Sequence, residues 1–188
     1  MRSDYGSLSD GDLATLAVAG TDAAYAEIVR RHRSPVYRLI LGNVSDADEA
    51  LDLTQETFLS AHRALRRYDP ARPMRSWLAA IALNKCRDWG RRRTVRRFFT
   101  FARDIDDMAM AVPDDRPDQE RMAGDRQALA RLRRAIADLP ASLREPLVLH
   151  AIEGMSQAET ASVLQTTVKA VEMRLRRARI RLGEALAR

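Results

Sequence analysis

The last third of the chain carries helix start and stop signals at such short intervals that only short helices fit between them. Apolar residues recur at helical spacing before Pro140, which stops the first of these helices. Gly154 is expected to end the second helix, and Ser156 with Glu159 forms a capping-box pattern for the third. Only a short turn near Gln165 separates the third helix from the fourth. This spacing is typical of a helix-turn-helix, and a plain helical bundle is the alternative.

Two further signals place the starts of the second and fourth helices of this region. Ser142 and Glu145 form another capping-box pattern, with Pro146 expected in the first turn of the same helix. Thr167 is expected to cap the last helix through its hydroxyl.

The last helix divides into two faces when the residues of "TTVKAVEMRLRRAR" and those after it are placed about 100° apart. Its core side is predicted to hold Val168, Val171, Leu175, Ala178 and Leu182. Its outward side is predicted to be basic and apolar and to hold Lys169, Ala170, Met173, Arg176, Arg177 and Ile180. Glu172 lies toward one boundary of this side. Arginine can contact guanine or phosphate, and small apolar side chains can contact a thymine methyl, so this side suits a DNA major groove. A solvated arginine face is the alternative, whereas a membrane-surface helix would need bulkier apolar residues.

The N-terminal half also shows helical periodicity, and no segment of the sequence has a convincing strand pattern. Thr21 is expected to cap a first helix, and a separate second helix is expected to end before Gly42. Ser45 is expected to open a long helix through a capping box with Asp48, and Ser76 to cap a further helix after the loop "YDPARPMRS". The inner face of the long helix is predicted to hold Leu51, Phe58, Leu59, His62 and Leu65.

Between the two halves the periodic pattern fails in an acidic, proline-containing stretch, "DIDDMAMAVPDDRPDQERMAG". Three phenylalanines just before it are expected to pack at a helix end: Phe98, Phe99 and Phe101. We therefore predict an all-α protein of two small helical domains, residues 1–94 and 125–188, joined by a flexible acidic linker over residues 95–124. The second domain is predicted to be the helix-turn-helix.

Composition limits the compartment and the kind of partner. The net charge of +6 comes almost entirely from arginine and favours a polyanionic partner such as nucleic acid. Cys86 is the only cysteine, which excludes an internal disulfide and suggests a reducing compartment. The N-terminus "MRSDYGSLSDGDL" does not resemble a signal peptide, and the longest strongly apolar run, "WLAAIAL", is too short to cross a bilayer. We expect a cytoplasmic protein with no membrane insertion.

No pattern points to catalysis. His32, His62, His150 and Cys86 are scattered, and the sequence has no HExxH, no CxxC and no glycine-rich phosphate loop. We therefore expect neither an enzyme nor a bound metal or cofactor.

Two blocks of sequence resemble the extracytoplasmic-function (ECF) group of bacterial RNA polymerase sigma factors, in the sigma-70 family. "DLTQETFLSAHRALRRYD" and "RSWLAAIALNKCRDWGRRR" resemble the family's D-x-x-Q-[ED]-x-F and R-x-W-L-x-x-I-x-x-N-x-x-x-D-x-x-R-R helices. "LPASLREPLVLHAIEGMSQAETASVLQTTVKAVEMRLRRARIRL" resembles L-P-x-x-x-R-x-x-[LV], then G-x-S-x-x-E-x-A-x-x-L, then V-x-x-R-L-x-R-A-R. The two blocks cover nearly the whole chain in the family's order.

For the first block, the resemblance implies docking on the clamp helices of the polymerase beta-prime subunit and recognition of the −10 promoter element. The docking residues would be Asp52, Gln55, Glu56 and Phe58, on an acidic face that suits a basic partner. The −10 residues would be Tyr68 and Asn84 around a flipped base, with phosphate contacts from Arg87, Arg91, Arg92 and Arg93. A solvated acidic face, a half-buried Tyr68 and a surface amide at Asn84 are the alternatives, and Trp77 and Ile81 are assigned to the core.

For the second block, the resemblance implies recognition of the −35 element as duplex DNA. The matching positions are His150, Gln157, Lys169, Ala170, Glu172, Met173, Arg176 and Arg177. Arg174 and Arg179 are assigned structural or phosphate roles. The acidic linker would thread the polymerase toward the RNA exit, where it could mimic RNA. The implied partners are core RNA polymerase (beta-prime and beta subunits), promoter DNA and an anti-sigma factor, in a stress response.

The sequence departs from the family pattern at four positions. Gln165 replaces a common turn glycine, Met74 replaces a frequent phenylalanine, and Thr160 stands at a usually aliphatic position. Glu172 is acidic where many members are basic, so it could accept a hydrogen bond from cytosine or repel phosphate.

The rival functions are a helix-turn-helix repressor or activator, which explains only residues 142–182, and a protein that binds a regulator but no DNA.

Overall fold

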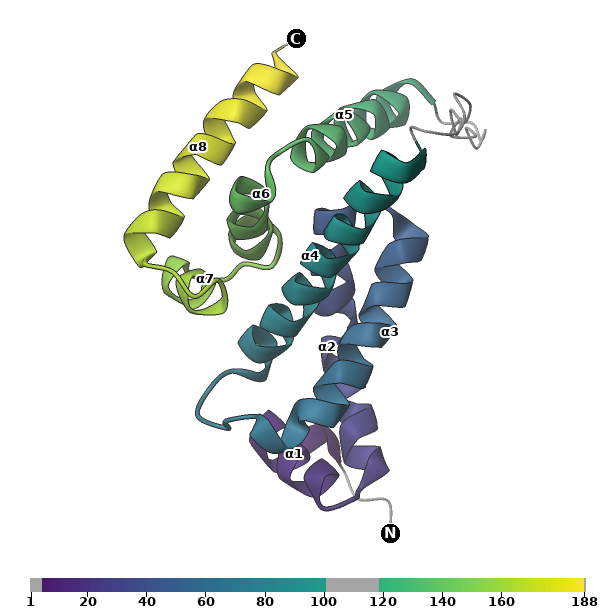
Figure 1. Cartoon of the computed structure of the whole chain (residues 1–188), viewed down its shortest axis with the longest axis vertical. Coiled ribbons are helices and arrows are strands. Elements are labelled where there is room, and N and C mark those ends of the chain that lie inside the picture. Colours follow the sequence, from purple (N-terminus) through teal and green to yellow (C-terminus); the bar gives the residue numbers. More distant parts are fainter. Residues whose placement is uncertain (1–4, 101–118, 188) are drawn as a thin grey trace.

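The computed structural model describes the backbone of residues 5–100 and 119–187, with side chains described over residues 5–94 and 127–187. All regular elements of these residues are helices, which confirms the all-α prediction. Figure 1 shows the first four α-helices packed together, with the last four on one side of them. The helices are α1 (Asp10–Val18), α2 (Asp22–Val44), α3 (Ala47–Ala64), α4 (Met74–Thr100), α5 (Gln119–Ala137), α6 (Ala141–Leu147), α7 (Gln157–Val163) and α8 (Val168–Leu186), with short helical turns η1 (Tyr5–Ser7), η2 (Leu65–Arg67) and η3 (Val148–Ile152).

The two helices predicted before Gly42 are one continuous helix, α2, which passes through Pro35. Proline removes a single backbone donor, and burial of Ile28, Val36 and Ile40 along one side of α2 outweighs that loss. Arg31 ties the N-terminal segment to this helix by donating hydrogen bonds to the carbonyl oxygens of Leu8 and Tyr5.

Two predicted helix starts in the first half, at Ser45 and Ser76, differ from the structure, and the start at Thr21 agrees with it. Ser45 ends α2 in the left-handed conformation (φ 59°), and Asp46 caps α3 by accepting hydrogen bonds from two backbone amides. Thr21 is the N-cap of α2 but makes no side-chain capping bond. Ser76 lies inside α4, which begins at Met74. Neighbouring polar residues compete for a cap, so sequence fixes its position only to within one or two residues.

Of the residues predicted for the inner face of the long helix, only Phe58 on α3 and Leu65, just after it on η2, are buried. Leu51 and Leu59 are 43% and 60% exposed, and His62 is exposed against the ring of Tyr25. The buried face instead holds small and medium side chains: Ala50, Leu53, Thr54, Thr57 and Ala61.

The capping box predicted at Ser142 and Glu145 is absent. Pro140 is the N-cap of α6 without a side-chain bond, and Glu145 is buried and pairs with Arg87 of α4. Pro146 lies within α6 rather than in its first turn, and the chain continues as the wider π-turn η3. Gly154 follows η3 with φ +65°, as expected for the residue that ends a helix.

The helix-turn-helix formed by α7 and α8 has the predicted caps. Ser156 and Glu159 make a reciprocal capping box, and the Thr167 hydroxyl accepts a hydrogen bond from the amide of Ala170. Gln165 lies in the turn with φ 52°, a conformation that favours glycine.

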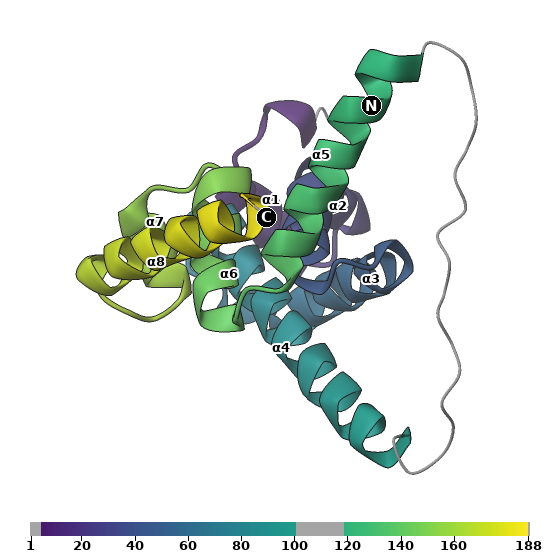
Figure 2. The same cartoon turned by 90° about the horizontal axis from the view of Figure 1, so that it is seen from above.

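The core runs through both halves of the chain. A larger cluster joins α1–α4 to Val148, Leu149, Met155 and Val163 of the second half, and a smaller cluster lies between α5, α6, α7 and α8. η3 packs on α2 and α7 packs on α4. Figure 2 shows α6 beside α4 when the molecule is seen from above.

The linker boundaries predicted at residues 95 and 124 fall inside helices, because α4 continues to Thr100 and α5 starts at Gln119. The predicted packing of Phe98, Phe99 and Phe101 lies outside the described side chains, and the central acidic stretch lies outside the described residues.

Candidate nucleic-acid interface

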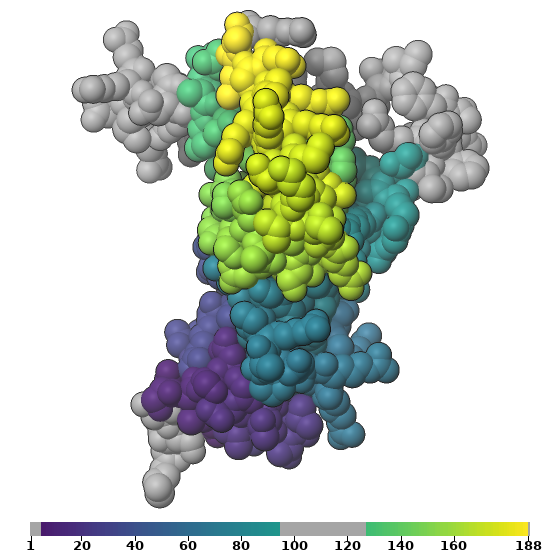
Figure 3. Space-filling view, turned by 90° about the vertical axis from the view of Figure 1, so that its left-hand side faces the viewer, coloured from purple at the N-terminus to yellow at the C-terminus, as the bar shows by residue number. Residues whose placement is uncertain are grey.

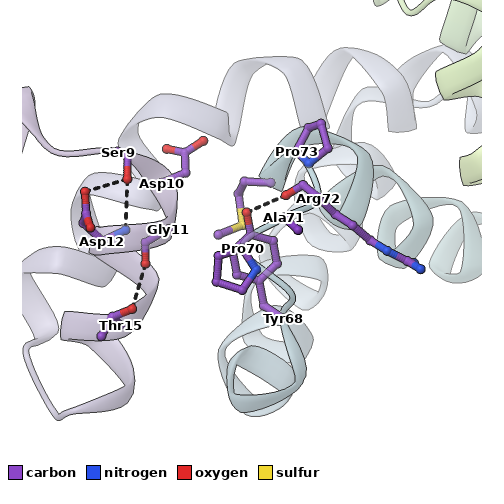
Figure 4. A pocket seen from close by; sticks show the side chains of 11 residues that line it. Ser9, Asp10, Gly11, Asp12, Thr15, Tyr68, Pro70, Ala71, Arg72 and Pro73 are labelled. Carbon is purple, nitrogen blue, oxygen red and sulfur yellow. Dashed lines mark hydrogen bonds between the residues drawn. The ribbon is translucent and has the colours of Figure 1, made fainter.

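A cavity of about 540 Å³ opens between the start of α1 and the loop before α4. Figure 4 shows Tyr68, Pro70, Arg72 and Pro73 on the loop side, opposite Ser9, Asp10 and Asp12 of the α1 side. Asp69 fixes the loop by accepting a hydrogen bond from the amide of Ala71. Met74, at the position where a phenylalanine is frequent, is 1% exposed at the base of this cavity.

Tyr68 lines this cavity but is held in place by two contacts. Its hydroxyl donates a hydrogen bond to the carbonyl oxygen of Arg72 at 2.7 Å, and its ring lies 5.2 Å from that of Trp77. Burial, reinforced by Asp10 and Asp69, raises the pKa of Tyr68. The side chain is therefore neutral and pre-positioned, with only a small part of its surface open to the cavity. Trp77 and Ile81 pack against the core, as assigned from the sequence.

The other predicted −10 residues follow along α4. Asn84 is exposed, and its side-chain oxygen accepts a hydrogen bond from Arg87 at 3.3 Å. Arg91, Arg92 and Arg93 are exposed on the next turn, where Arg91 pairs with Asp88 and Arg93 lies over the ring of Trp89. Asn84 and these arginines therefore lie on the helix that directly follows the loop lining the cavity.

Arg87 is already occupied by an acidic side chain from the second half. Its Nε and Nη2 atoms donate hydrogen bonds to the two carboxylate oxygens of Glu145 at 2.8 and 2.6 Å. This pairing holds the pKa of Arg87 above its ordinary value. A second pair between the halves joins Arg38 to Glu153 at 3.2 Å. Neither pair could be predicted from the sequence, because contacts between residues far apart in the chain leave no local pattern.

The outward face of α8 lies open to solvent. Lys169, Glu172, Met173, Arg176 and Arg177 are exposed, while Val171, Leu175 and Ala178 are buried in the smaller core. Val168, predicted on the core side, is 47% exposed at the first residue of α8, so the buried stripe of this helix begins one turn later, at Val171. Glu172 pairs with Lys169 at 3.3 Å, so part of its charge is balanced on the same face.

The remaining two −35 candidates lie on other elements. Gln157 is the first residue of α7 and is partly exposed. His150 lies on η3, where its Nδ1 atom is 2.7 Å from the carbonyl oxygen of Met155. Figure 3 shows α8 and the start of α4 on one face of the molecule.

The predicted docking residues divide between the surface and the core. Asp52 and Gln55 are exposed on α3, and Glu56 pairs with Lys85 of α4 at 3.4 Å. Phe58 is not free to contact a partner, since it is only 7% exposed and packs inward; the exposed apolar residue of this turn is Leu59.

The described part of the chain has neither a candidate metal site nor a candidate membrane-spanning helix. No cluster of three or more His, Cys, Asp or Glu side chains there could hold a metal ion. No helix there has both the length and the apolar character needed to span a bilayer.

Comparison with known proteins gives matches to both halves. The model of Sigma-70 region 2 matches residues 28–96, and that of Sigma-70, region 4 matches residues 129–182. The RNA polymerase sigma factor CnrH of Cupriavidus metallidurans is 39% identical over 95% of this chain and 94% of its own length. The ECF RNA polymerase sigma factor SigM of Mycobacterium tuberculosis is 33% identical over 95% of this chain and 85% of its own length.

Two solved structures are similar. The structure of CnrH in complex with the cytosolic domain of CnrY has a TM-score of 0.70 at 34% identity and covers 95% of this chain and 97% of that one. The structure of the sigma factor RpoE in complex with the anti-sigma factor NepR, from Bartonella quintana, has a TM-score of 0.68 at 21% identity, with coverages of 87% and 96%, and shows the shared fold.

Proposed function

Because this chain belongs to the ECF group of sigma-70 factors, which are not enzymes, we propose that it binds core RNA polymerase and directs initiation at promoters with its own −10 and −35 elements. One observation carries the proposal beyond the family match. The cavity beside the loop before α4 and the exposed outer face of α8 are two separate candidate surfaces, and Figure 3 shows the start of α4 and α8 on one face of the molecule. A simple helix-turn-helix repressor would need only the second of these. We place the protein in the cytoplasm, where its template lies.

The −35 element would be read in the major groove by α8. Arg176 and Arg177 present guanidinium groups for guanine or phosphate, and Ala170 and Met173 present apolar surface for thymine methyl groups. The Lys169–Glu172 pair favours Glu172 as a hydrogen-bond acceptor for cytosine, because the lysine partly screens its repulsion of phosphate. Gln157 and His150 would contribute from the preceding helices.

The −10 element would be held as single strand along α4. Asn84 offers an amide to a base edge, and Arg87, Arg91, Arg92 and Arg93 offer positive charge to the phosphates. Tyr68, with its hydroxyl occupied, would act through the apolar surface of its ring at the cavity wall.

Core polymerase would dock on the outer face of α3 through Asp52, Gln55 and Glu56. Clamp-helix arginines would complement this acidic face, and Phe58 would support it from below. The linker would run through the polymerase between the two domains, and the beta subunit would contact the second domain.

An anti-sigma factor would hold the protein inactive between signals. Support comes from the similar structures, in which CnrH is bound to the cytosolic domain of CnrY and RpoE to the anti-sigma factor NepR.

The experiment is in vitro transcription with purified core polymerase and a randomised promoter library. We expect transcripts that depend on the added protein and share −10 and −35 motifs. Tight, specific binding of duplex DNA by the protein alone, with no binding to core polymerase, would instead identify a repressor. Asn84→Ala, at an exposed position, should lower promoter opening without changing folding stability; unchanged opening would remove Asn84 from the −10 site.

A further inference from the structure

The first turn of α1 forms one wall of the cavity of about 540 Å³ that Tyr68 also lines, and the proposed function gives this wall no role. Figure 4 shows Asp10 on this wall, between Ser9 and the loop before α4. A Cβ atom added at Gly11 would lie 3.3 Å from Cβ of Pro70. The first turn of α1 therefore packs directly on the loop, which fixes where its polar side chains stand around the cavity.

The carboxylate of Asp10 is held in place by two side chains of α2. Its Oδ1 atom accepts a hydrogen bond from Nη1 of Arg31 at 3.2 Å, and its Oδ2 atom lies 2.9 Å from Nε2 of His32. Glu27 holds the same arginine by accepting a hydrogen bond from its Nε atom at 2.8 Å. Because Arg31 balances part of the charge of Asp10, this carboxylate repels a nearby phosphate less than an unpaired one would.

Asp10 keeps the capacity to accept further hydrogen bonds. A carboxylate has about four lone-pair sites, and these contacts with Arg31 and His32 occupy two of them. The Asp10 side chain is 28% exposed, so a ligand in the cavity can reach it. Asp12 also lines the cavity, but its carboxylate accepts a hydrogen bond from the Ser9 hydroxyl at 2.6 Å, as Figure 4 shows. Asp10 is therefore a pre-positioned acceptor across the cavity from the loop.

An unpaired base in this cavity would meet the loop, with Tyr68 and two prolines, on one side and an acceptor on the other. Flipped bases are recognised in this way, by stacking against aromatic and apolar side chains and by hydrogen bonds to their pairing edge. Adenine and cytosine carry an exocyclic amino group that donates, whereas thymine carries a carbonyl oxygen at the corresponding position. A carboxylate accepts hydrogen bonds and donates none, so it favours the amino group over the carbonyl.

We propose that Asp10 accepts a hydrogen bond from the exocyclic amino group of the unpaired −10 base in this cavity, and that it thereby selects adenine or cytosine over thymine. This inference rests on the proposed function, since it takes the cavity as part of the −10 site. It adds a residue of α1, outside the matched region 2 over residues 28–96, to those that set promoter preference. Arg31 and His32 act on the base only through Asp10, as positioning residues.

Asp10→Asn tests the selection while keeping the shape of the side chain. Arg31 should hold the amide oxygen, which leaves the amide NH2 group, a donor, toward the cavity. Transcripts made with core polymerase from promoters with a randomised −10 element are sequenced, and the melting temperature is measured to check folding. We expect the preference for adenine or cytosine over thymine to fall about tenfold at one −10 position, the size of one lost base contact, with the other positions unchanged.

Glu27→Gln is the matched control for Asp10→Asn. It removes another carboxylate from Arg31, but Glu27 does not line the cavity, so the base preference should be unchanged.

A second measurement uses the wild-type protein and so does not depend on how a variant folds. The selected base of the non-template strand is replaced by an analogue that lacks the amino group, purine for adenine or 2-pyrimidinone for cytosine. Initiation by the wild-type protein should fall about tenfold, and initiation by Asp10→Asn should not respond to the replacement.

Four outcomes would overturn the inference. They are a wild-type protein with no −10 position that favours adenine or cytosine over thymine, an unchanged preference in Asp10→Asn, an equal loss in Glu27→Gln, and full wild-type initiation from the analogue without the amino group. In each of these outcomes the wild-type protein still initiates, so the proposed function stands. Absence of wild-type transcription would instead overturn the proposed function and this inference with it.

Discussion

Thr160 buries a hydroxyl that has no hydrogen-bond partner among the described residues. Its side chain is 0% exposed on α7, at a position where the family comparison leads one to expect an aliphatic residue. Burying an unpaired hydroxyl costs about 1–3 kcal/mol. We predict that Thr160→Val, which keeps the shape, raises the free energy of unfolding by about 1 kcal/mol, seen as a higher urea midpoint with an unchanged slope.

Thr57→Val is the matched control for that substitution. Thr57 is equally buried, but its hydroxyl donates a hydrogen bond to the carbonyl oxygen of Leu53 at 2.7 Å. It should show no comparable gain. Equal effects at the two positions would mean that hydrogen bonding of the hydroxyl does not decide the outcome.

Gln165 holds the turn of the helix-turn-helix in a conformation that its side chain disfavours. Its φ of 52° costs a non-glycine residue about 1–2 kcal/mol. We predict that Gln165→Gly raises the melting temperature by a few degrees, since the strain it relieves exceeds the added chain entropy. Gln165→Ala keeps the Cβ atom and should give no gain; stabilisation by alanine would show that the turn is not strained.

At the scale of single elements, α8 should carry the −35 preference. Arg176 and Arg177 are exposed on its outer face, and neither makes an ion pair with another side chain that the structure describes. We predict that alanine at either position weakens use of −35-dependent promoters by about 1–3 kcal/mol if it contacts a base. If the arginine contacts a phosphate instead, its removal should reduce the slope of log affinity against log salt concentration by about one. Transcription from matched promoters with intact and scrambled −35 elements measures this.

Arg181→Ala is the control for Arg176→Ala. It removes an exposed arginine from the same helix, at a position that lines the groove between α6 and α8, which Arg176 does not line. Loss of −35 use comparable to that of Arg176→Ala would show that net charge, and not the reading face, determines the effect.

The elements also show what local sequence can and cannot predict. Ser156–Glu159 and Thr167 were predicted correctly because each cap is satisfied within one turn of its own helix. Glu145 has the same spacing from a serine, yet its carboxylate pairs with Arg87, 58 residues away. The split predicted in α2 failed for a related reason, since long-range burial along that helix outweighs the single donor lost at Pro35.

At the scale of the whole molecule, the association of the halves could not be predicted from sequence. No local sequence pattern indicates that Val148, Leu149 and Met155 are buried against the first half. Gly42, where an added Cβ atom would lie too close to Val148, looks in the sequence like the end of a helix. The candidate DNA-binding and docking residues come from family motifs, which record contacts with partners outside the chain, and they stay predictions. Tyr68 and Phe58 match the motifs but are largely buried, which the motifs do not indicate.

Cys86 should report on this association through its reactivity. Its thiol is 8% exposed on α4, where burial and the nearby Glu145 carboxylate raise its pKa from 9.0 to about 12. Only the thiolate reacts, so at pH 8 about one molecule in ten thousand is reactive, and the alkylation rate should keep rising above pH 9, where an exposed cysteine levels off. Separating the halves takes the Glu145 carboxylate away from Cys86 and exposes more of its thiol. In the Gly42→Leu variant Cys86 should therefore be alkylated faster, and its rate should level off at a lower pH. Iodoacetamide labelling at a series of pH values, followed by mass spectrometry, measures the alkylation rate and its pH dependence. If Cys86 of the native wild-type protein reacts as fast as it does in urea, the two halves are not packed together over it.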